Sequence, residues 1–168
     1  GTFSPFYNPS QELNRDISVS SIATYFDTFK TTSEKNEKLD KNDKNKGDKK
    51  FTLIDAMSAT GLRAVRYLRE LPENLLEKIY ANDLDSKAVE LIKENAVLNG
   101  DKNNIIDIHQ KDAAALLYSL KNHFDVVDLD PYGTAVNLID SAIWAVKNNG
   151  LILATFTDMQ VLCGNYQE

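Results

Sequence analysis

From residue 51 onward, short apolar runs alternate with helical segments, and few folds can accommodate this order. We predict strands at 51–56, 78–83, 105–109, 124–129 and 151–156, separated by helices at 62–71, 85–98, 113–120 and 135–146. Regular alternation of this kind is typical of a sheet of parallel strands with crossover helices. The sequence therefore predicts an α/β fold with a parallel sheet for residues 51–168.

Residues 1–30 precede the alternating region and differ from it. Phe3, Phe6 and Tyr7 stand around two prolines and predict an extended aromatic arm. Ser10 is a favourable N-cap for a helix at 11–29. An apolar stripe with a period near 3.6 runs along that helix: Leu13, Ile17, Ile22, Phe26 and Phe29. We assign the arm and the helix to the same domain as the sheet.

Residues 31–50 are dominated by Lys, Asn, Asp and Glu, and Leu39 is their only sizeable apolar residue. Such a segment buries too little apolar surface to offset the entropy lost on ordering, so we predict a disordered polar insert. At the other end, the chain stops soon after the fifth predicted strand, where a doubly wound sheet normally continues. We therefore expect a fragment of a longer protein.

The charge and the composition exclude several classes of protein. The net charge is −6, and residues 51–168 carry ten basic against seventeen acidic side chains. Phosphate binding depends mostly on Lys and Arg, so the chain by itself is a poor nucleic-acid surface. No apolar run approaches the ~20 residues of a membrane span. Cys163 is the single cysteine, which excludes an intrachain disulfide and a cysteine-rich zinc site.

In open parallel sheets, ligands bind at the carboxyl ends of the strands, so the residues after each strand are informative. The loop at 55–61 is built of small residues and opens a helix, where backbone N–H groups can face an anion. Its only glycine is Gly61, whereas a dinucleotide fingerprint needs three. The loop argues against NAD or FAD and fits S-adenosylmethionine better. Arg63, at the start of the helix, is a ligand candidate, whereas Arg66 and Arg69 fit a solvated face.

Acidic residues follow the second and third predicted strands. Asp83 lies 22 residues beyond Gly61, near the separation at which an acid meets ribose hydroxyls. Asp112 is placed to accept the amino group of an adenine, with the N–H of Ala113 near the ring. For Asp83 and Asp112 alike the alternative is a role in capping the next helix, for which Asp is well suited.

The fourth predicted strand runs into Asp130-Pro131-Tyr132-Gly133. The carboxylate of Asp130 and a backbone carbonyl can accept the two hydrogens of an exocyclic amino group, while Tyr132 offers a ring for stacking. Such acceptors orient the nitrogen lone pair toward an electrophilic methyl group and stabilise positive charge that develops on the nitrogen. The alternative is a simple turn, which Asp-Pro commonly forms.

Together these motifs resemble the tRNA (guanine(26)-N2)-dimethyltransferases. The resemblance covers nearly the whole chain outside 31–50, and its most specific parts are Asn14-Arg15-Asp16 and the loop Ser58-Ala59-Thr60-Gly61-Leu62-Arg63. Also shared are Phe6-Tyr7-Asn8-Pro9, Ala81-Asn82-Asp83, Asp128-Leu129-Asp130-Pro131-Tyr132-Gly133 and Thr157-Asp158-Met159-Gln160-Val161-Leu162.

The resemblance implies a class I, Rossmann-like methyltransferase fold, S-adenosylmethionine as cofactor, and transfer of one or two methyl groups to N2 of a guanine in tRNA. It places a set of residues at the cofactor: Arg15, Arg63, Asp83, Asp112 and Ala113. It places Asp130, Pro131 and Tyr132 at the reacting amino group, with Phe6 and Tyr132 beside the base. It also implies a C-terminal tRNA-binding domain beyond this chain and an intracellular location, with nucleus, cytoplasm and mitochondrion equally open.

Two alternatives remain open at the level of the sequence. One is another S-adenosylmethionine-dependent amino-methyltransferase, acting on DNA adenine, a protein or a small molecule. The other is a non-catalytic nucleoside-binding module of the same fold. No membrane or metal is expected as a partner.

Overall fold

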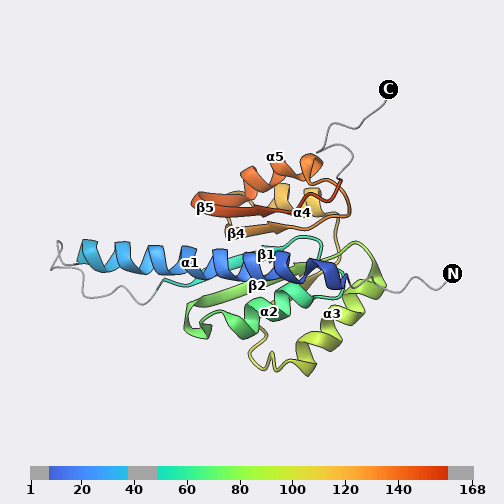
Figure 1. Cartoon of the computed structure of the whole chain (residues 1–168), viewed down its shortest axis with the longest axis horizontal. Coiled ribbons are helices and arrows are strands. Elements are labelled where there is room, and N and C mark those ends of the chain that lie inside the picture. The colour runs from blue at the N-terminus through green and yellow to red at the C-terminus, as the bar shows by residue number, and fades with distance from the viewer. Residues whose placement is uncertain (1–7, 38–48, 159–168) are drawn as a thin grey trace.

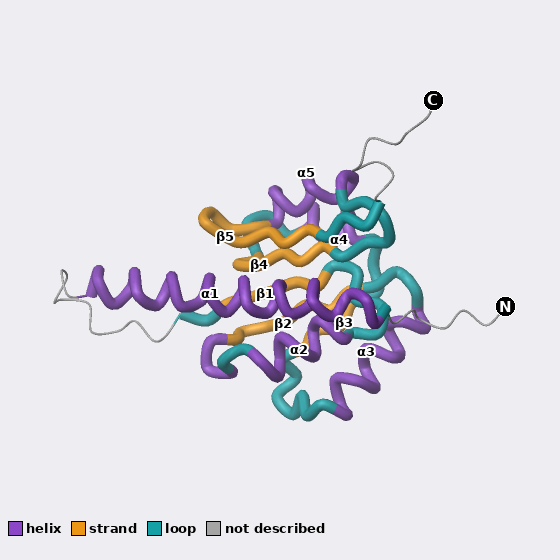
Figure 2. Tube along the Cα trace, viewed as in Figure 1, coloured by secondary structure: helices purple, strands orange, loops and turns teal. Residues whose placement is uncertain are grey.

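Five parallel strands form one sheet with helices on both faces, which confirms the predicted α/β fold (Figures 1 and 2). The computed structural model describes residues 8–37 and 49–158. The described elements are, in chain order, η1 (Pro9–Gln11), α1 (Glu12–Glu37), β1 (Phe51–Asp55), α2 (Leu62–Glu70), η2 (Glu73–Leu75), β2 (Leu76–Asn82), α3 (Ser86–Leu98), β3 (Ile106–His109), α4 (Ala113–Ser119), β4 (Phe124–Leu129), α5 (Val136–Ala145) and β5 (Val146–Ala154).

The strand order in the sheet is β3-β2-β1-β4-β5, so the chain winds outward from β1 to β3 and then returns to lay β4 on the other side of β1. The order reverses between β1 and β4, and this is where open α/β sheets bind their ligands. Both strands are buried along their whole length, as expected for the centre of a sheet that is covered on both faces.

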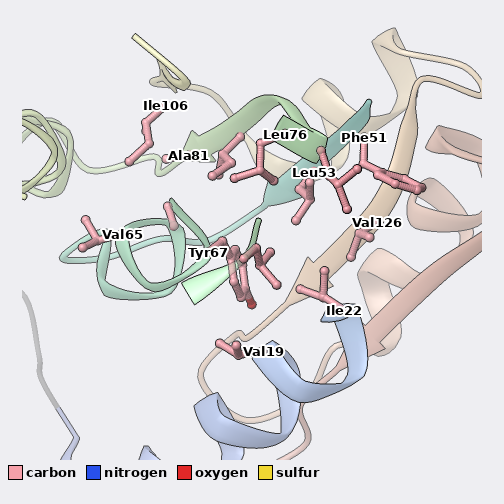
Figure 3. Packing of buried hydrophobic residues seen from close by; sticks show 14 of the residues in the cluster. Val19, Ile22, Phe51, Leu53, Val65, Tyr67, Leu76, Ala81, Ile106 and Val126 are labelled. Atoms are coloured by element: carbon pink, nitrogen blue, oxygen red, sulfur yellow. The ribbon is translucent and has the colours of Figure 1, made fainter. Parts of the chain in front are cut away.

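Successive side chains of the central strands pack alternately into two separate hydrophobic cores. Leu53 and Val126 point to the face covered by α1, α2 and α3, where they pack with Ile22 and Tyr67 (Figure 3). Ile54 and Val127 point to the opposite face, which α4 and α5 cover. Asp55 and Asp128 are register partners in the parallel pair, two residues beyond Leu53 and Val126. Their side chains therefore point to the α1–α2 face as well.

Helix α1 differs from the prediction in its length and in its buried face. It continues to Glu37, whereas we predicted that it ends at residue 29; residues 38–48 of the predicted insert lie outside the described part. Ile22 and Phe26 are buried as expected, but Leu13 and Ile17 are 70% and 57% exposed. The first turns instead bury two polar residues, Arg15 and Ser18. This exchange occurs where α1 passes over the carboxyl ends of the strands (Figure 1).

The transition from α5 to β5 also departs from the prediction. We predicted a helix to residue 146 and a strand from residue 151, but α5 ends at Ala145 and β5 begins at once with Val146. Pairing with β4 shifts register between Phe124 and Val126, and Asn149 has a positive φ of 63° within this irregular stretch. A side chain at Gly150 would lie 2.9 Å from the carbonyl oxygen of Asp125, so close packing of two backbones requires glycine there.

Candidate active site

A pocket of about 340 Å³ opens at the carboxyl ends of β1 and β4, where the strand order reverses. Four segments that are distant in the sequence form its wall: residues 8–15, the loop after β1 with the start of α2, the loop after β4, and the segment after β5. The lining residues are Asn8, Gln11, Arg15, Met57, Ser58, Ala59, Thr60, Leu62, Arg63, Asp130, Pro131, Tyr132 and Thr157. The structure thus brings together five predicted site residues: Arg15, Arg63, Asp130, Pro131 and Tyr132.

The loop after β1 is fixed by its own backbone hydrogen bonds. The N–H of Ser58 donates to the carbonyl oxygen of Asn82 over 2.8 Å, and that of Gly61 donates to the carbonyl oxygen of Ser58 over 2.7 Å. Gly61 has a φ of 75°, and a Cβ there would lie 3.2 Å from Ile92. Helix α2 starts directly after Gly61 without a side-chain cap, so its first N–H groups are available beside the pocket.

Arg63 is the most connected side chain of the site. It is buried, and three of its nitrogens donate to four acceptors. Nε donates to Oδ2 of Asp130 over 2.8 Å, and Nη1 donates to Oδ2 of Asp128 over 3.1 Å. The other two acceptors lie on α1: Ser18 Oγ is 2.8 Å from Nη1, and Asn14 Oδ1 is 2.9 Å from Nη2. Arg63 thus joins α2 to the end of β4 and to α1.

Behind Arg63 lies a group of buried acids. The hydroxyl of Tyr67 donates to Oδ2 of Asp128, which therefore serves two donors. Burial, assisted by the neighbouring Asp128, raises the pKa of Asp55 to about 7, although Arg63 acts in the opposite direction. Burial also raises the pKa of Asp128, against the opposing effects of Arg63 and Tyr67. One guanidinium thus faces several carboxyl groups, and protonation of Asp55 relieves their repulsion.

The loop after β4 is held from two sides. On one side Arg63 binds the carboxylate of Asp130. On the other, Gly133 and Thr157 form two hydrogen bonds: Gly133 N–H donates to Thr157 Oγ1 over 3.1 Å, and Thr157 N–H donates to the carbonyl oxygen of Gly133 over 2.8 Å. Gly133 has a φ of 86°, which favours glycine. Between these anchors Tyr132 is 81% exposed at the edge of the pocket.

Asp83, Asp112 and Ala113 follow β2 and β3 at the same edge of the sheet, although they do not line the pocket. One carboxylate oxygen of Asp83 accepts from the N–H of Ala59 over 2.8 Å, which ties Asp83 to the loop after β1. Asp112 is the N-cap of α4 and accepts from the N–H of Ala115 over 2.9 Å. The capping alternative for Asp112 is thus realised, and a role at an adenine stays a prediction.

Several polar residues of this site were not predicted from the sequence. Asn82 is 1% exposed, and its amide donates to the carbonyl oxygens of Ala56 and Lys111, both over 3.0 Å, while its Oδ1 accepts from the N–H of Lys111. It thereby links the loops after β1 and β3. Asn14, Ser18 and Tyr67 were missed as well. The available signal was their position inside apolar helical stripes, where a polar side chain needs a partner.

Four further expectations concern two predicted site residues, a metal and a membrane. Arg15 is buried beside the pocket, and its Nη1 donates to the carbonyl oxygen of Asn8 over 3.1 Å. Phe6, predicted beside the base, lies outside the described residues. Among residues 8–29 and 49–158, no group of three or more His, Cys, Asp or Glu is arranged to hold a metal ion. Within the part that the structure describes, no helix is both long and apolar enough to cross a membrane.

Comparison with known proteins adds a family likeness. A family model described as N2,N2-dimethylguanosine tRNA methyltransferase matches residues 3–168. Relatives named tRNA (guanine(26)-N(2))-dimethyltransferase are 39% identical in Caenorhabditis elegans and 38% identical in Methanococcus maripaludis, each matching 97% of this chain. A mitochondrial relative of that name from Saccharomyces cerevisiae is 39% identical over 95% of the chain. The chain spans 33–39% of the length of these relatives.

Solved structures show the same likeness. Trm1 from Pyrococcus horikoshii, described in complex with S-adenosyl-L-methionine, matches with a TM-score of 0.73 and 30% identity over 96% of this chain and 40% of that one. The tRNA m1G37 methyltransferase of M. jannaschii matches with a TM-score of 0.60 over 89% of the chain, and at 19% identity it supports the fold alone. These matches confirm the predicted Rossmann-like methyltransferase fold.

Proposed function

This chain belongs to the N2,N2-dimethylguanosine tRNA methyltransferase family, and from that premise we propose that it is the catalytic region of an enzyme that methylates N2 of a guanine in tRNA. The proposed cofactor is S-adenosylmethionine, and the products are mono- and dimethylguanosine. The observation that supports this most directly is the position of Asp130. Its carboxylate lines the pocket beside the exposed ring of Tyr132, and Arg63 fixes one of its oxygens.

The residues around the pocket suit a nucleoside bearing an amino acid. The uncapped start of α2 and Arg15 offer donors to a carboxylate, while Asp83 and Asp112 follow the neighbouring strands as acceptors for hydroxyl and amino groups. We assign Arg15, Asp83, Asp112 and Ala113 to S-adenosylmethionine. Arg63, which the resemblance also places at the cofactor, is bound instead by Asp130, Asp128, Ser18 and Asn14. When bound, this cofactor supplies an electrophilic methyl group.

The loop after β4 would act on the base. The free oxygen Oδ1 of Asp130 and a backbone carbonyl accept the two hydrogens of the guanine amino group, which turns the nitrogen lone pair toward the methyl group. Pro131 carries no N–H, so no backbone donor competes for these acceptors at that position. Tyr132 stacks on the base. Methyl transfer would form the N–C bond and break the bond between the methyl carbon and the sulfonium sulfur, so that S-adenosylhomocysteine leaves. The carboxylate of Asp130 would stabilise the positive charge that develops on the nitrogen, which would then lose a proton to the carboxylate or to solvent water.

Recognition of the whole tRNA would depend on residues outside 1–168. The chain has a net charge of −6, whereas RNA binding is dominated by Lys and Arg. The relatives are longer by a factor of about three. We therefore propose that most phosphate contacts come from the remaining part of the protein, and that the enzyme works inside the cell, where tRNA is processed.

The function is tested with the full-length protein, unmodified tRNA and S-adenosylmethionine, followed by mass spectrometry of the digested nucleosides. We expect N2-methylguanosine and N2,N2-dimethylguanosine to form. The matched substrate is the same tRNA with adenosine in place of guanosine 26, the position in the relatives' name, and it should stay unmodified. Methylation of adenine, or no methylated nucleoside from well-folded protein, would contradict the proposal.

We predict that Asn82→Ala weakens binding of S-adenosylhomocysteine about 10-fold, because two loops of the proposed cofactor site lose their shared anchor of hydrogen bonds. Isothermal titration calorimetry measures the effect. The control is Asn137→Ala, which removes the same side chain from an exposed position on α5. Equal affinity in wild type and Asn82→Ala would show that the loops hold their places without Asn82.

A further inference from the structure

Arg63 is placed at the cofactor by family resemblance, but its contacts in this structure point elsewhere. Of its five N–H donors, four are engaged by protein acceptors: Asp130, Asp128, Ser18 and Asn14. The side chain is 6% exposed, so little of the guanidinium is left for a ligand. A buried arginine with so many partners orients those partners.

The partner that matters for the reaction is Asp130. Its side chain is 26% exposed, and it extends into the pocket from the position directly after β4. A carboxylate at a loop can rotate about χ1 and χ2, and each rotamer offers its oxygens in a different direction. The bond from Arg63 Nε to Oδ2 over 2.8 Å selects one of them. Oδ1 then has a fixed direction from which to accept a substrate hydrogen.

The geometry of the guanidinium explains why a lysine would not do the same. Nε and Nη1 belong to one rigid plane and reach two different carboxylates, Asp130 and Asp128. Asp128 is itself held by the hydroxyl of Tyr67. From α1, Asn14 accepts from Nη2 and Ser18 accepts from Nη1. An ammonium is a point charge and cannot span these acceptors, so the direction of Asp130 would be lost even though the charge is kept.

We propose that Arg63 is a positioning residue for the methyl-accepting half of the site: it acts on the reaction through Asp130, backed by Tyr67, Asn14 and Ser18. The inference rests on the proposed function, since it assigns Arg63 a task within that reaction. It differs from a cofactor-binding role in what it predicts. A positioning residue changes the rate of methyl transfer from the fully bound state, whereas a cofactor ligand changes affinity.

The test is Arg63→Lys in the full-length protein, compared with wild type. We expect the single-turnover rate of guanine methylation at saturating cofactor and tRNA to fall about 100-fold, the size typical of a lost preorganised contact. The dissociation constant of S-adenosylhomocysteine should stay within about 3-fold of the wild-type value. Arg66→Lys is the matched control, because Arg66 also pairs with two carboxylates on α2's exposed side and is absent from the pocket.

A double-mutant cycle with Asp130→Asn decides whether Arg63 acts through Asp130. We expect Arg63→Lys to cost less than about 3-fold in the Asp130→Asn background. If the rate losses of the two single variants multiply in the double variant, the inference is overturned. It is also overturned if Arg63→Lys weakens S-adenosylhomocysteine binding at least about 10-fold and leaves the saturated rate unchanged.

If Arg63→Lys does not fold, the double variant Asn14→Ala/Ser18→Ala keeps the arginine and removes its two hydrogen-bond partners on α1. A rate lowered about 10-fold with unchanged affinity supports the inference; an unchanged rate refutes it. Absence of methylation by wild type would instead refute the proposed function.

Discussion

Replacing Asp130 with alanine is expected to lower the rate of guanine N2 methylation by about 10³-fold or more in the full-length protein. The carboxylate is the one acidic side chain that lines the pocket in the part of the chain that the structure describes. Without it, the amino group loses its charged acceptor, and the nitrogen lone pair is no longer held toward the methyl donor. The measurement is the single-turnover appearance of methylated guanosine by mass spectrometry.

Two comparisons make this prediction specific. Binding of S-adenosylhomocysteine to Asp130→Ala should stay within about 3-fold of wild type, because the loss concerns the acceptor rather than the cofactor. Asp140→Ala removes the same side chain from an exposed position on α5 and should methylate at the wild-type rate. Undiminished methylation by Asp130→Ala would remove Asp130 from the mechanism.

The second large effect concerns stability as a function of pH. Burial beside Asp128 raises the pKa of Asp55 to about 7, against an ordinary value near 4 in the unfolded chain. Between these values the folded protein holds a proton that the unfolded chain releases, so a rise in pH favours unfolding. The stabilisation is complete below pH 4 and is lost as the pH rises through 7. We expect the free energy of unfolding to fall by roughly 3–4 kcal/mol across this range.

Asp55→Asn is the variant that isolates this effect, because the amide keeps the shape of the carboxyl and cannot ionise. Its free energy of unfolding should change much less between pH 5 and pH 8, and at pH 8 it should exceed the wild-type value by about 2–4 kcal/mol. Urea unfolding, followed by the fluorescence of Trp144, the single tryptophan, provides the measurement. Asp85→Asn, at an exposed N-cap where asparagine is equally suitable, is the control. If the free energy of unfolding of wild type and of Asp55→Asn changed with pH in the same way, the raised pKa of Asp55 would not be the cause of the pH dependence.

The sheet was predictable because its signal is local. Each apolar run between turn residues is long enough to mark a buried strand, and β4 begins and ends at the predicted residues 124 and 129. The signals at the strand ends were equally readable: Asp112 caps α4, and Gly61 directly precedes α2. Helix α1 was less predictable. The period of an apolar stripe indicates a helix, but it does not show which face of the helix packs against the sheet. Leu13 and Ile17 fit the period, yet they are exposed.

The sequence by itself determined the α/β fold and the motifs at the ends of its strands, since short-range patterns of polarity and turn chemistry specify both. Only the tertiary structure decided which of these motifs meet. Asn14, Ser18, Arg63 and Asp130 span more than a hundred residues of chain, and they converge because β4 returns beside β1 and α1 crosses above them. No local sequence pattern encodes that convergence. It depends on a guanidinium that is only 6% exposed and therefore binds carboxylates and polar side chains of two other elements.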